Sequence, residues 1–136
     1  MELVSVRVIT GDVSRLVAFY EKATALSAAW ATEDFAELAT PGGATLAIAG
    51  TRTVPLFAPG AARPGENHSA IIEFLVADVD EVHRNLVAAL PDADFVAGPT
   101  NMPWGNRSLL VRDPDGNLVN FFTPVGPDAV RKFARN

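Results

Sequence analysis

The sequence contains no cysteine, which excludes disulfide bonds, thiolate metal ligands and cysteine nucleophiles. It also lacks long apolar runs, since no stretch approaches the ~18 residues that a membrane-spanning helix needs. The first residues show no basic segment followed by an apolar one, so we expect no signal peptide. Together these absences predict a cytoplasmic protein without a membrane partner.

Clusters of lysine and arginine are absent as well. The chain has 11 basic and 16 acidic residues, a net charge of −5 and a pI near 4.9, so we expect no nucleic-acid partner. A cationic ligand is compatible with this charge, although acidity by itself indicates only solubility. What remains is the composition of a folded domain, because 49% of the 136 residues are hydrophobic and only 20% are charged.

Common catalytic motifs are also missing. The sequence has no P-loop, no GxSxG nucleophile motif and no dinucleotide-binding GxGxxG after a strand. Its two histidines, His68 and His83, fall in a predicted linker and a predicted helix, where a Ser-His-Asp triad has no natural place. Motifs alone therefore predict no catalytic site.

The first half of the chain has the pattern of a βαβββ module. Apolar residues at helical spacing predict a helix over 13–24, with Thr10 or Asp12 as its N-cap. Strands are predicted, from β-branched residues and turn signals, at 4–9, 28–32, 35–40 and 44–49.

The second half has the same pattern. A helix over 79–90 is capped by Asp78, and a hairpin is predicted around the turn Asp113-Pro114-Asp115-Gly116-Asn117. We expect a loop over 98–106 and a C-terminal helix near 127–134 that packs on the outside. The predicted strands are 70–76, 95–97, 107–112 and 118–123.

The two halves match residue by residue. Val8–Val13 corresponds to Phe74–Val79, 66 residues later, and Thr40–Gly43 corresponds to Asp113–Gly116, 73 residues later. Units this small cannot each bury a sheet face alone, so we expect them to pair around a shared surface. The predicted fold is α+β in one domain, divided into module one at 1–50, a linker at 51–69, module two at 70–124 and a tail or helix at 125–136.

Several short motifs carry a resemblance to a known family. They are Asp12-Val13, Phe19-Tyr20, Phe74-x-Val76-x-Asp78-Val79-Asp80, Pro103-Trp104-Gly105, Arg107-Ser108 and the DPDGN turn. With them, residues 4–124 resemble the vicinal-oxygen-chelate superfamily, which includes glyoxalase I, extradiol dioxygenases, fosfomycin-resistance enzymes and bleomycin-resistance proteins. The resemblance implies a curled, cupped mixed sheet around a small-molecule cavity, and a homodimer.

In this superfamily a divalent metal is usually held by one residue on the first and last strand of each module, typically two histidines and two glutamates. Counting from the helix-capping aspartates and from DPDGN places those positions at Ser5, Ala47, Ile71 and Asn120. Isoleucine and alanine cannot coordinate a metal, and a neutral amide is a poor single ligand. We therefore expect no metal at this position and no cofactor.

Strand alternation predicts which side chains line the cavity instead. Phe57 of the linker either closes over this cavity or tucks onto the domain, and Trp104 lies at its mouth or anchors its own loop. Trp30 is compatible with the core, a dimer interface or the pocket. The predicted ligand-binding residues are Ser5, Arg7, Phe35, Glu37, Ala47, Phe57, Ile71, Glu73, Trp104, Ser108, Leu110, Asn120 and Phe122.

The charged residues in this set admit more than one interpretation each. Arg7 and Glu73 are equivalent in the repeat, so they either form an internal ion pair or orient a polar ligand. For Glu37 there are three interpretations: it binds a cation, it acts as a general base, or it is solvated at the rim of the cavity.

The predicted function is metal-independent binding of an aromatic or drug-like small molecule, similar in type to bleomycin-resistance proteins and so linked to antibiotic resistance. One alternative is a metal-independent enzyme that uses Glu37, Glu73 or Arg7. Another is a metal-dependent lyase or dioxygenase with an atypical site built from Glu37, Glu73 or His68. A structural or regulatory interaction module is the last alternative.

Overall fold

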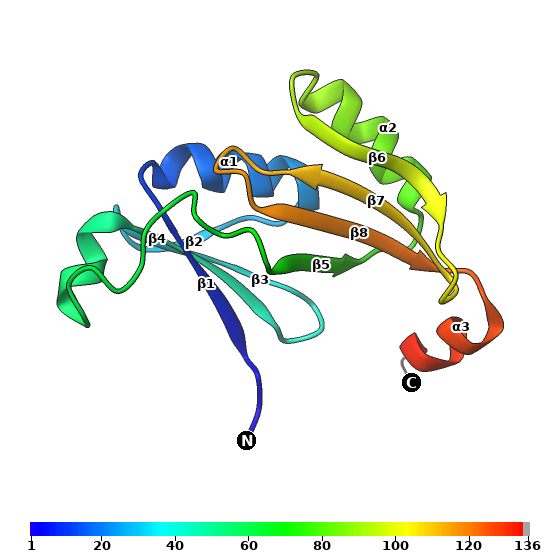
Figure 1. Cartoon of the computed structure of the whole chain (residues 1–136), viewed down its shortest axis with the longest axis horizontal. Coiled ribbons are helices and arrows are strands. Elements are labelled where there is room, and N and C mark those ends of the chain that lie inside the picture. The colour runs from blue at the N-terminus through cyan, green and yellow to red at the C-terminus, as the bar shows by residue number, and fades with distance from the viewer. Residues whose placement is uncertain (135–136) are drawn as a thin grey trace. The chain divides into compact units, whose positions relative to one another are not determined.

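The computed structural model describes residues 1–134. It divides into two compact units, one made of Met1–Asn67 with Pro114–Gly116 and the other of the remaining described residues from His68 onward. Each unit contains one four-stranded mixed sheet and one long helix (Figure 1). The α+β class and the curled-sheet fold are thereby confirmed.

The first unit contains strands and helices in the order βαβββ. Its sheet has the strand order β1-β4-β3-β2, with β1 parallel to β4 and the other neighbours antiparallel. The elements are β1 (Ser5–Thr10), α1 (Val13–Thr24), β2 (Ala29–Thr32), β3 (Phe35–Ala39), β4 (Thr45–Gly50) and the short 3-10 helix η1 (Thr51–Leu56).

The second unit repeats this topology, with strand order β5-β8-β7-β6 and β5 parallel to β8. The repeat extends to the register, because Arg7 is opposite Ala47 and its equivalent Glu73 is opposite Asn120. The elements are β5 (Ile71–Leu75), α2 (Val79–Ala89), β6 (Asp94–Asn101), β7 (Asn106–Arg112), β8 (Leu118–Pro124) and α3 (Pro127–Phe133).

Both long helices begin where the sequence predicts. The Asp12 carboxylate accepts a hydrogen bond from the backbone N–H of Arg15 at 3.1 Å, and the Asp78 carboxylate accepts from the N–H groups of Asp80 and Glu81. These side chains satisfy donors that the first turn of a helix leaves unpaired. Of the two N-cap candidates, Thr10 and Asp12, the structure confirms Asp12.

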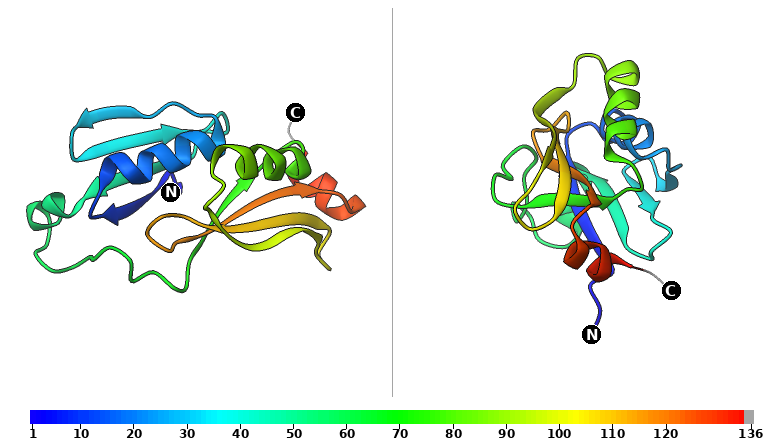
Figure 2. Two further views of the ribbon diagram at one scale, coloured as in Figure 1. Left: turned by 90° about the horizontal axis from the view of Figure 1, so that it is seen from above. Right: turned by 90° about the vertical axis from the view of Figure 1, so that its right-hand side faces the viewer.

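Each helix packs on one face of its own sheet (Figure 2). In the first unit, α1 covers strand positions that are fully or almost fully buried, among them Ala36, Leu38, Leu46 and Ile48. In the second unit, α2 covers Leu109, Val111, Val119 and Phe121. Because side chains alternate along a strand, the residues between these positions point to the face away from the helix.

The turn between β7 and β8 has the predicted hairpin geometry. The Asp113 carboxylate accepts hydrogen bonds from the backbone N–H and the side-chain amide of Asn117, at 3.0 and 2.8 Å. Gly116 has a φ of +86°, a conformation that L-residues with a side chain rarely adopt. These local bonds fix the register between the strand before the turn, β7, and the strand after it, β8.

Strand β6 corrects the sequence analysis, which predicted a strand over 95–97 and a loop over 98–106. The strand runs from Asp94 to Asn101 and includes Gly98 and Pro99. It is an edge strand with irregular register between Phe95 and Thr100, and edge strands tolerate both residue types at bulges. Gly98 and Pro99 therefore mark an irregular edge strand and not a loop.

The C-terminal helix α3 is a second correction, because it does not pack on the outside of its unit. The ring of Phe133 lies 5.1 Å from the ring of Phe122, which points to the face of the sheet away from α2. Ala129 of the same helix is buried. The last part of the predicted tail, 135–136, lies outside the described residues.

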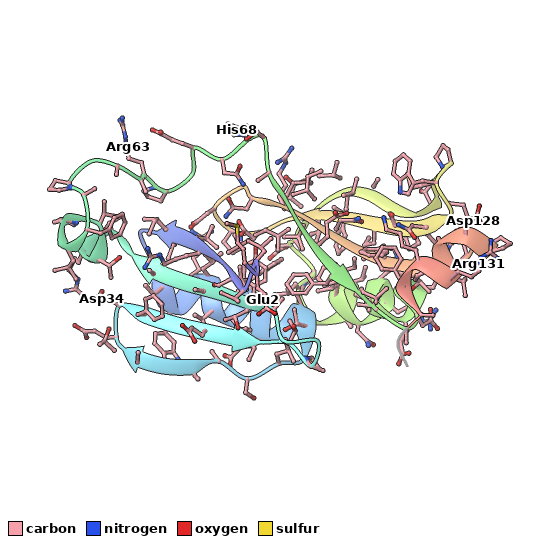
Figure 3. All side chains as sticks on the ribbon, turned by 90° about the horizontal axis from the view of Figure 1, so that it is seen from below. Glu2, Asp34, Arg63, His68, Asp128 and Arg131 are labelled. Atoms are coloured by element: carbon pink, nitrogen blue, oxygen red, sulfur yellow. The ribbon has the colours of Figure 1, made fainter. Side chains whose placement is uncertain are left out.

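The start of the predicted linker is folded. Arg52 of η1 binds Asp34 at 2.8 Å and Glu33 at 3.3 Å, and both acidic residues lie in the turn between β2 and β3, where Figure 3 labels Asp34. This ion pair stabilises η1 against the hairpin of its own sheet. Among residues 1–134, no helix has the length and apolar character needed to cross a membrane.

Helix α1 ends in a strained residue, which yields a stability prediction. Ala25 has a φ of 59°, and its N–H donates to the carbonyl of Glu21 at 3.0 Å. A left-handed conformation costs an alanine about 1–2 kcal/mol, partly offset by the lower chain entropy of alanine when unfolded. We expect Ala25→Gly to raise the free energy of unfolding in urea by about 0.5–1 kcal/mol.

The matched control is Ala18→Gly on the exposed side of α1, where the backbone is right-handed. That change should lower the free energy of unfolding by about 1 kcal/mol. Equal effects of the two substitutions would contradict the assignment of strain to Ala25.

The first turn of α2 carries a pH-dependent contact. Arg107 donates two hydrogen bonds to the Asp80 carboxylate, at 2.9 and 3.0 Å, and these hold the pKa of that carboxyl below its ordinary 3.8. The stabilisation is therefore complete above about pH 3.8 and is lost as the pH falls through the lowered pKa.

Thermal unfolding between pH 2 and 7 tests this contact. Asp80→Asn should lower the melting temperature near neutral pH, and its difference from the unchanged protein should disappear in strong acid. The control Asp92→Asn changes an exposed carboxylate after α2 and should leave the acid limb unchanged. A difference between Asp80→Asn and the unchanged protein that is constant over pH would contradict the prediction.

Candidate functional site

The second sheet carries a polar pair on its face away from α2, formed by its edge strand β5 and the neighbouring strand β8. Glu73 of β5 and Asn120 of β8 are register partners, and the Asn120 side-chain amide donates to Glu73 Oε2 at 2.8 Å. Leu110 of β7 lies on the other side of Asn120 in the same row. All three were predicted to line the cavity, and the strand pairing places them next to one another.

Three polar atoms on this face are buried without a hydrogen-bond partner. They are Asn106 Oδ1, Ser108 Oγ and Asn120 Oδ1. Only 5% of Ser108 and 8% of Asn120 is exposed to solvent. A buried polar group without a partner costs about 1–3 kcal/mol, so these atoms mark where a bound molecule would gain most from supplying hydrogen bonds.

Apolar side chains surround these polar atoms. Ile71 and Leu75 of β5 are 50% and 38% exposed, and they flank Glu73 on the same face. Phe122, the register partner of Ser108, is covered by Phe133 of α3. The face therefore combines a few fixed polar groups with exposed hydrocarbon, which is the usual make-up of a small-molecule site.

A pocket of about 480 Å³ lies at the end of this sheet, between β5, β8 and α3. Its lining is apolar, and its one side-chain hydroxyl, of Thr123, already donates to Val76 O and accepts from Val79 N–H. Leu75 belongs to both the pocket and the face described above. Ser108 and Asn120 do not line the pocket, and both are buried on the sheet face beside it.

The first sheet has an equivalent row on its face away from α1. Arg7 of β1 is opposite Ala47 of β4, and Ala47 is opposite Glu37 of β3. The guanidinium carbon of Arg7 lies 5.0 Å from the ring centroid of Phe57. Such cation–π contacts contribute about 0.5–1 kcal/mol at exposed sites. Phe57 thus contacts a residue of its own sheet that was predicted to face the cavity, and this contact fits both of its interpretations.

The remaining predicted residues of the first unit are Ser5, which is exposed, and Phe35, which is half-buried at the end of β3. Arg7 and Glu73 belong to different units, and their ion pair stays a prediction. Within its own unit each has another contact, Arg7 with Phe57 and Glu73 with Asn120.

Comparison with known proteins identifies the family. The model described as Glyoxalase/Bleomycin resistance protein/Dioxygenase superfamily matches residues 2–121. The chain belongs to this superfamily. No curated protein matches the sequence.

Several solved structures have the same fold. A family enzyme from Burkholderia phytofirmans PsJN is 18% identical, with a TM-score of 0.77 over 92% of this chain and 100% of that chain. A glyoxalase-related enzyme from Fulvimarina pelagi is 19% identical, with a TM-score of 0.74 over 93% and 94%. A virulence protein from Salmonella typhimurium is 25% identical, with a TM-score of 0.71 over 92% and 98%.

The residues at the expected metal positions do not suit the metal that the superfamily implies. Ser5 is opposite Thr45 and Ile71 is opposite Leu118, so Ser5 and Ala47, like Ile71 and Asn120, are offset by two residues along their paired strands. Among residues 1–134, no three His, Cys, Asp or Glu side chains are placed to hold a metal ion. His68 lies in the segment that precedes β5 (Figure 3).

Trp104 is the most exposed aromatic residue of the predicted set, at 67%. Its loop between β6 and β7 is held by backbone, since Gly105 O accepts from the N–H groups of Val125 and Gly126. A Cβ on Gly126 would lie only 3.0 Å from the Gly105 Cα, so glycine makes this approach possible. The indole ring is left available to a partner. Trp30, 45% exposed, lies on the edge strand β2.

Sequence reasoning missed Asn106 and the covering residue Phe133. Asn106 lies two positions before Ser108 and therefore on the same face, so strand alternation could have found it. The position of Phe133 had no comparable signal, because a short amphipathic helix fits either face of a sheet.

The unpaired amide oxygen leads to a prediction about stability. Asn120→Leu removes a buried acceptor and leaves Glu73, which is exposed and can be hydrated. We expect the free energy of unfolding in urea to change by less than about 1 kcal/mol, or to rise. Leu109→Ala, on the face covered by α2, should cost about 2–5 kcal/mol. A loss of that size for Asn120→Leu would mean that the amide mainly serves the fold.

Proposed function

We propose that the chain binds a small organic molecule without a metal ion and releases it chemically unchanged. The observation that carries this proposal is the state of Asn120. Its amide nitrogen is held by Glu73 while its oxygen is buried and unpaired, at the position where the superfamily usually has its last metal ligand. An unpaired acceptor that lies near the apolar side chains of Leu110 and Ile71 suits a ligand that supplies a donor.

Aromatic or drug-like ligands fit the residues around these faces. Exposed aromatic rings are present in both units, at Trp30 and Phe57 in the first and Trp104 in the second. Large flat side chains contribute much binding area at low entropic cost. A ligand held in this way is withdrawn from its target in the cell, which would confer resistance if the ligand is an antibiotic.

Metal-independent catalysis is the second candidate. Glu73 is the residue that favours it, because this carboxylate lies against an amide on an apolar face, where it could accept a proton from a bound molecule. Release of unchanged ligand separates binding from this candidate. A cytoplasmic homodimer, as expected for the superfamily, is part of the same proposal.

Titration of the protein with planar aromatic antibiotics, followed by tryptophan fluorescence, tests the proposal. We expect saturable quenching, full recovery of the unchanged compound, and the same affinity after exhaustive dialysis against a chelator. Elemental analysis of the dialysed protein should find no stoichiometric metal. Turnover of a bound compound would favour the enzyme, and a retained stoichiometric ion that is needed for binding would refute metal independence.

The chain has only two tryptophans, so single variants assign the signal. Trp104→Phe should remove most of the quenching if the second unit binds the ligand, whereas Trp30→Phe should remove most of it if the first unit does. Retention of the full signal in both variants would show that neither ring contacts the ligand.

A further inference from the structure

We propose that the second sheet recognises a cationic nitrogen group with several N–H donors, such as an amidinium, a guanidinium or a protonated amine. The recognition site consists of Glu73 and Asn120, with Ser108 beside them. This inference rests on the proposed function and specifies the chemical class of its ligand.

The orientation of the Asn120 amide is fixed by its partner. An ionised carboxylate only accepts hydrogen bonds, so the nitrogen of the amide must face Glu73. The oxygen is therefore turned away from Glu73 and is buried without a donor. Asn120 Oδ1 can therefore accept a hydrogen bond only from a group other than Glu73, such as a donor on a bound ligand.

The atoms available to a ligand at this place are mostly acceptors. Asn120 Oδ1 lacks a donor, and Glu73 uses one carboxylate oxygen for its bond to Asn120. Ser108 Oγ, also unpaired, can accept or donate. Neighbouring strands lie about 4.8 Å apart, so Glu73 and Asn120 together suit a planar group with donors on two nitrogens.

Charge favours a cation over a neutral donor. Glu73 supplies a negative charge on the edge strand β5, next to Asn120, and the chain as a whole has a net charge of −5. Arg112 lies on the same face, and its Nε is 4.0 Å from Oδ2 of Asp94. The negative charge of Asp94 offsets the positive charge of this arginine. An anionic ligand would find the hydroxyl of Ser108 as a donor there, but it would lie beside the negative charge of Glu73.

The apolar surroundings set the shape of the rest of the ligand. Ile71 and Leu75 flank Glu73 along β5, and Leu110 follows Asn120 across the sheet. An aromatic ring that carries the cationic group would lie on these side chains. Fixed acceptors within exposed hydrocarbon thus predict an aromatic cation.

A series of three compounds with one ring tests the charge and the donors. Benzamidine is cationic with N–H donors, benzamide is neutral with N–H donors, and benzoate is anionic with none. Binding is followed by changes in the amide NMR resonances of the isotope-labelled full chain. We expect benzamidine to bind tightest and benzoate weakest, with the largest shifts at the Asn120 side-chain amide and at Ser108.

Variants test the residues. Glu73→Gln and Asn120→Leu should each weaken benzamidine at least about tenfold, because each removes a charge-assisted or buried hydrogen bond. The control Glu81→Gln removes an exposed carboxylate of α2 in the same unit and should leave the affinity unchanged. Amide spectra of each variant show whether it is folded.

The outcomes separate this inference from the proposed function. Equal or tighter binding of benzoate, or unchanged benzamidine affinity in Glu73→Gln and Asn120→Leu, would overturn the cationic class. If planar antibiotics still bind in that case, the proposed function stands. If neither the three compounds nor the antibiotics bind, the proposed function fails and the inference fails with it.

Discussion

The parallel pairing of the first and last strand in each unit is the constraint on which the rest of the structure depends. A strand followed by a helix can return to the same sheet as a parallel neighbour only if the helix lies on one face. In each unit the helix crosses from the first strand to the strand at the far edge of the same sheet, β2 or β6, so α1 and α2 each lie on one side of their sheet. The opposite side of the central strands is thereby left for other contacts.

Much of this arrangement could be predicted from the sequence because it depends on local signals. The capping carboxylates of Asp12 and Asp78 and the turn at Asp113–Asn117 each act within a few residues, so their effects follow from residue type and spacing. The internal repeat then gave the correspondence between the sheets, and the register of Arg7 and Glu73 agrees with it.

Features that depend on tertiary context were not predictable in this way. Gly98 and Pro99 indicate a loop unless the strand is known to be an edge, and the ring of Phe133 could have packed on either face. The site shows the same limit. Counting along each strand correctly identified Asn120 as a residue of the open face, but only the pairing of strands shows that its neighbour is Glu73 rather than Ile71.

The two repeats have kept one geometry and acquired different chemistry. Equivalent rows carry Arg7, Ala47 and Glu37 in the first sheet, and Glu73, Asn120 and Leu110 in the second. A site that needs matching ligands from both repeats cannot be built from such rows, whereas each row can recognise a different chemical group.

The buried oxygen of Asn120 indicates what maintains this difference. An unpaired buried acceptor lowers stability, and replacement by a hydrocarbon side chain would remove that cost. Proteins commonly accept such a cost where the group contacts a ligand, because stability and function make opposing demands on the same atoms. The proposed binding of a ligand would explain why an amide with an unpaired oxygen stands where a hydrocarbon side chain would serve the fold better.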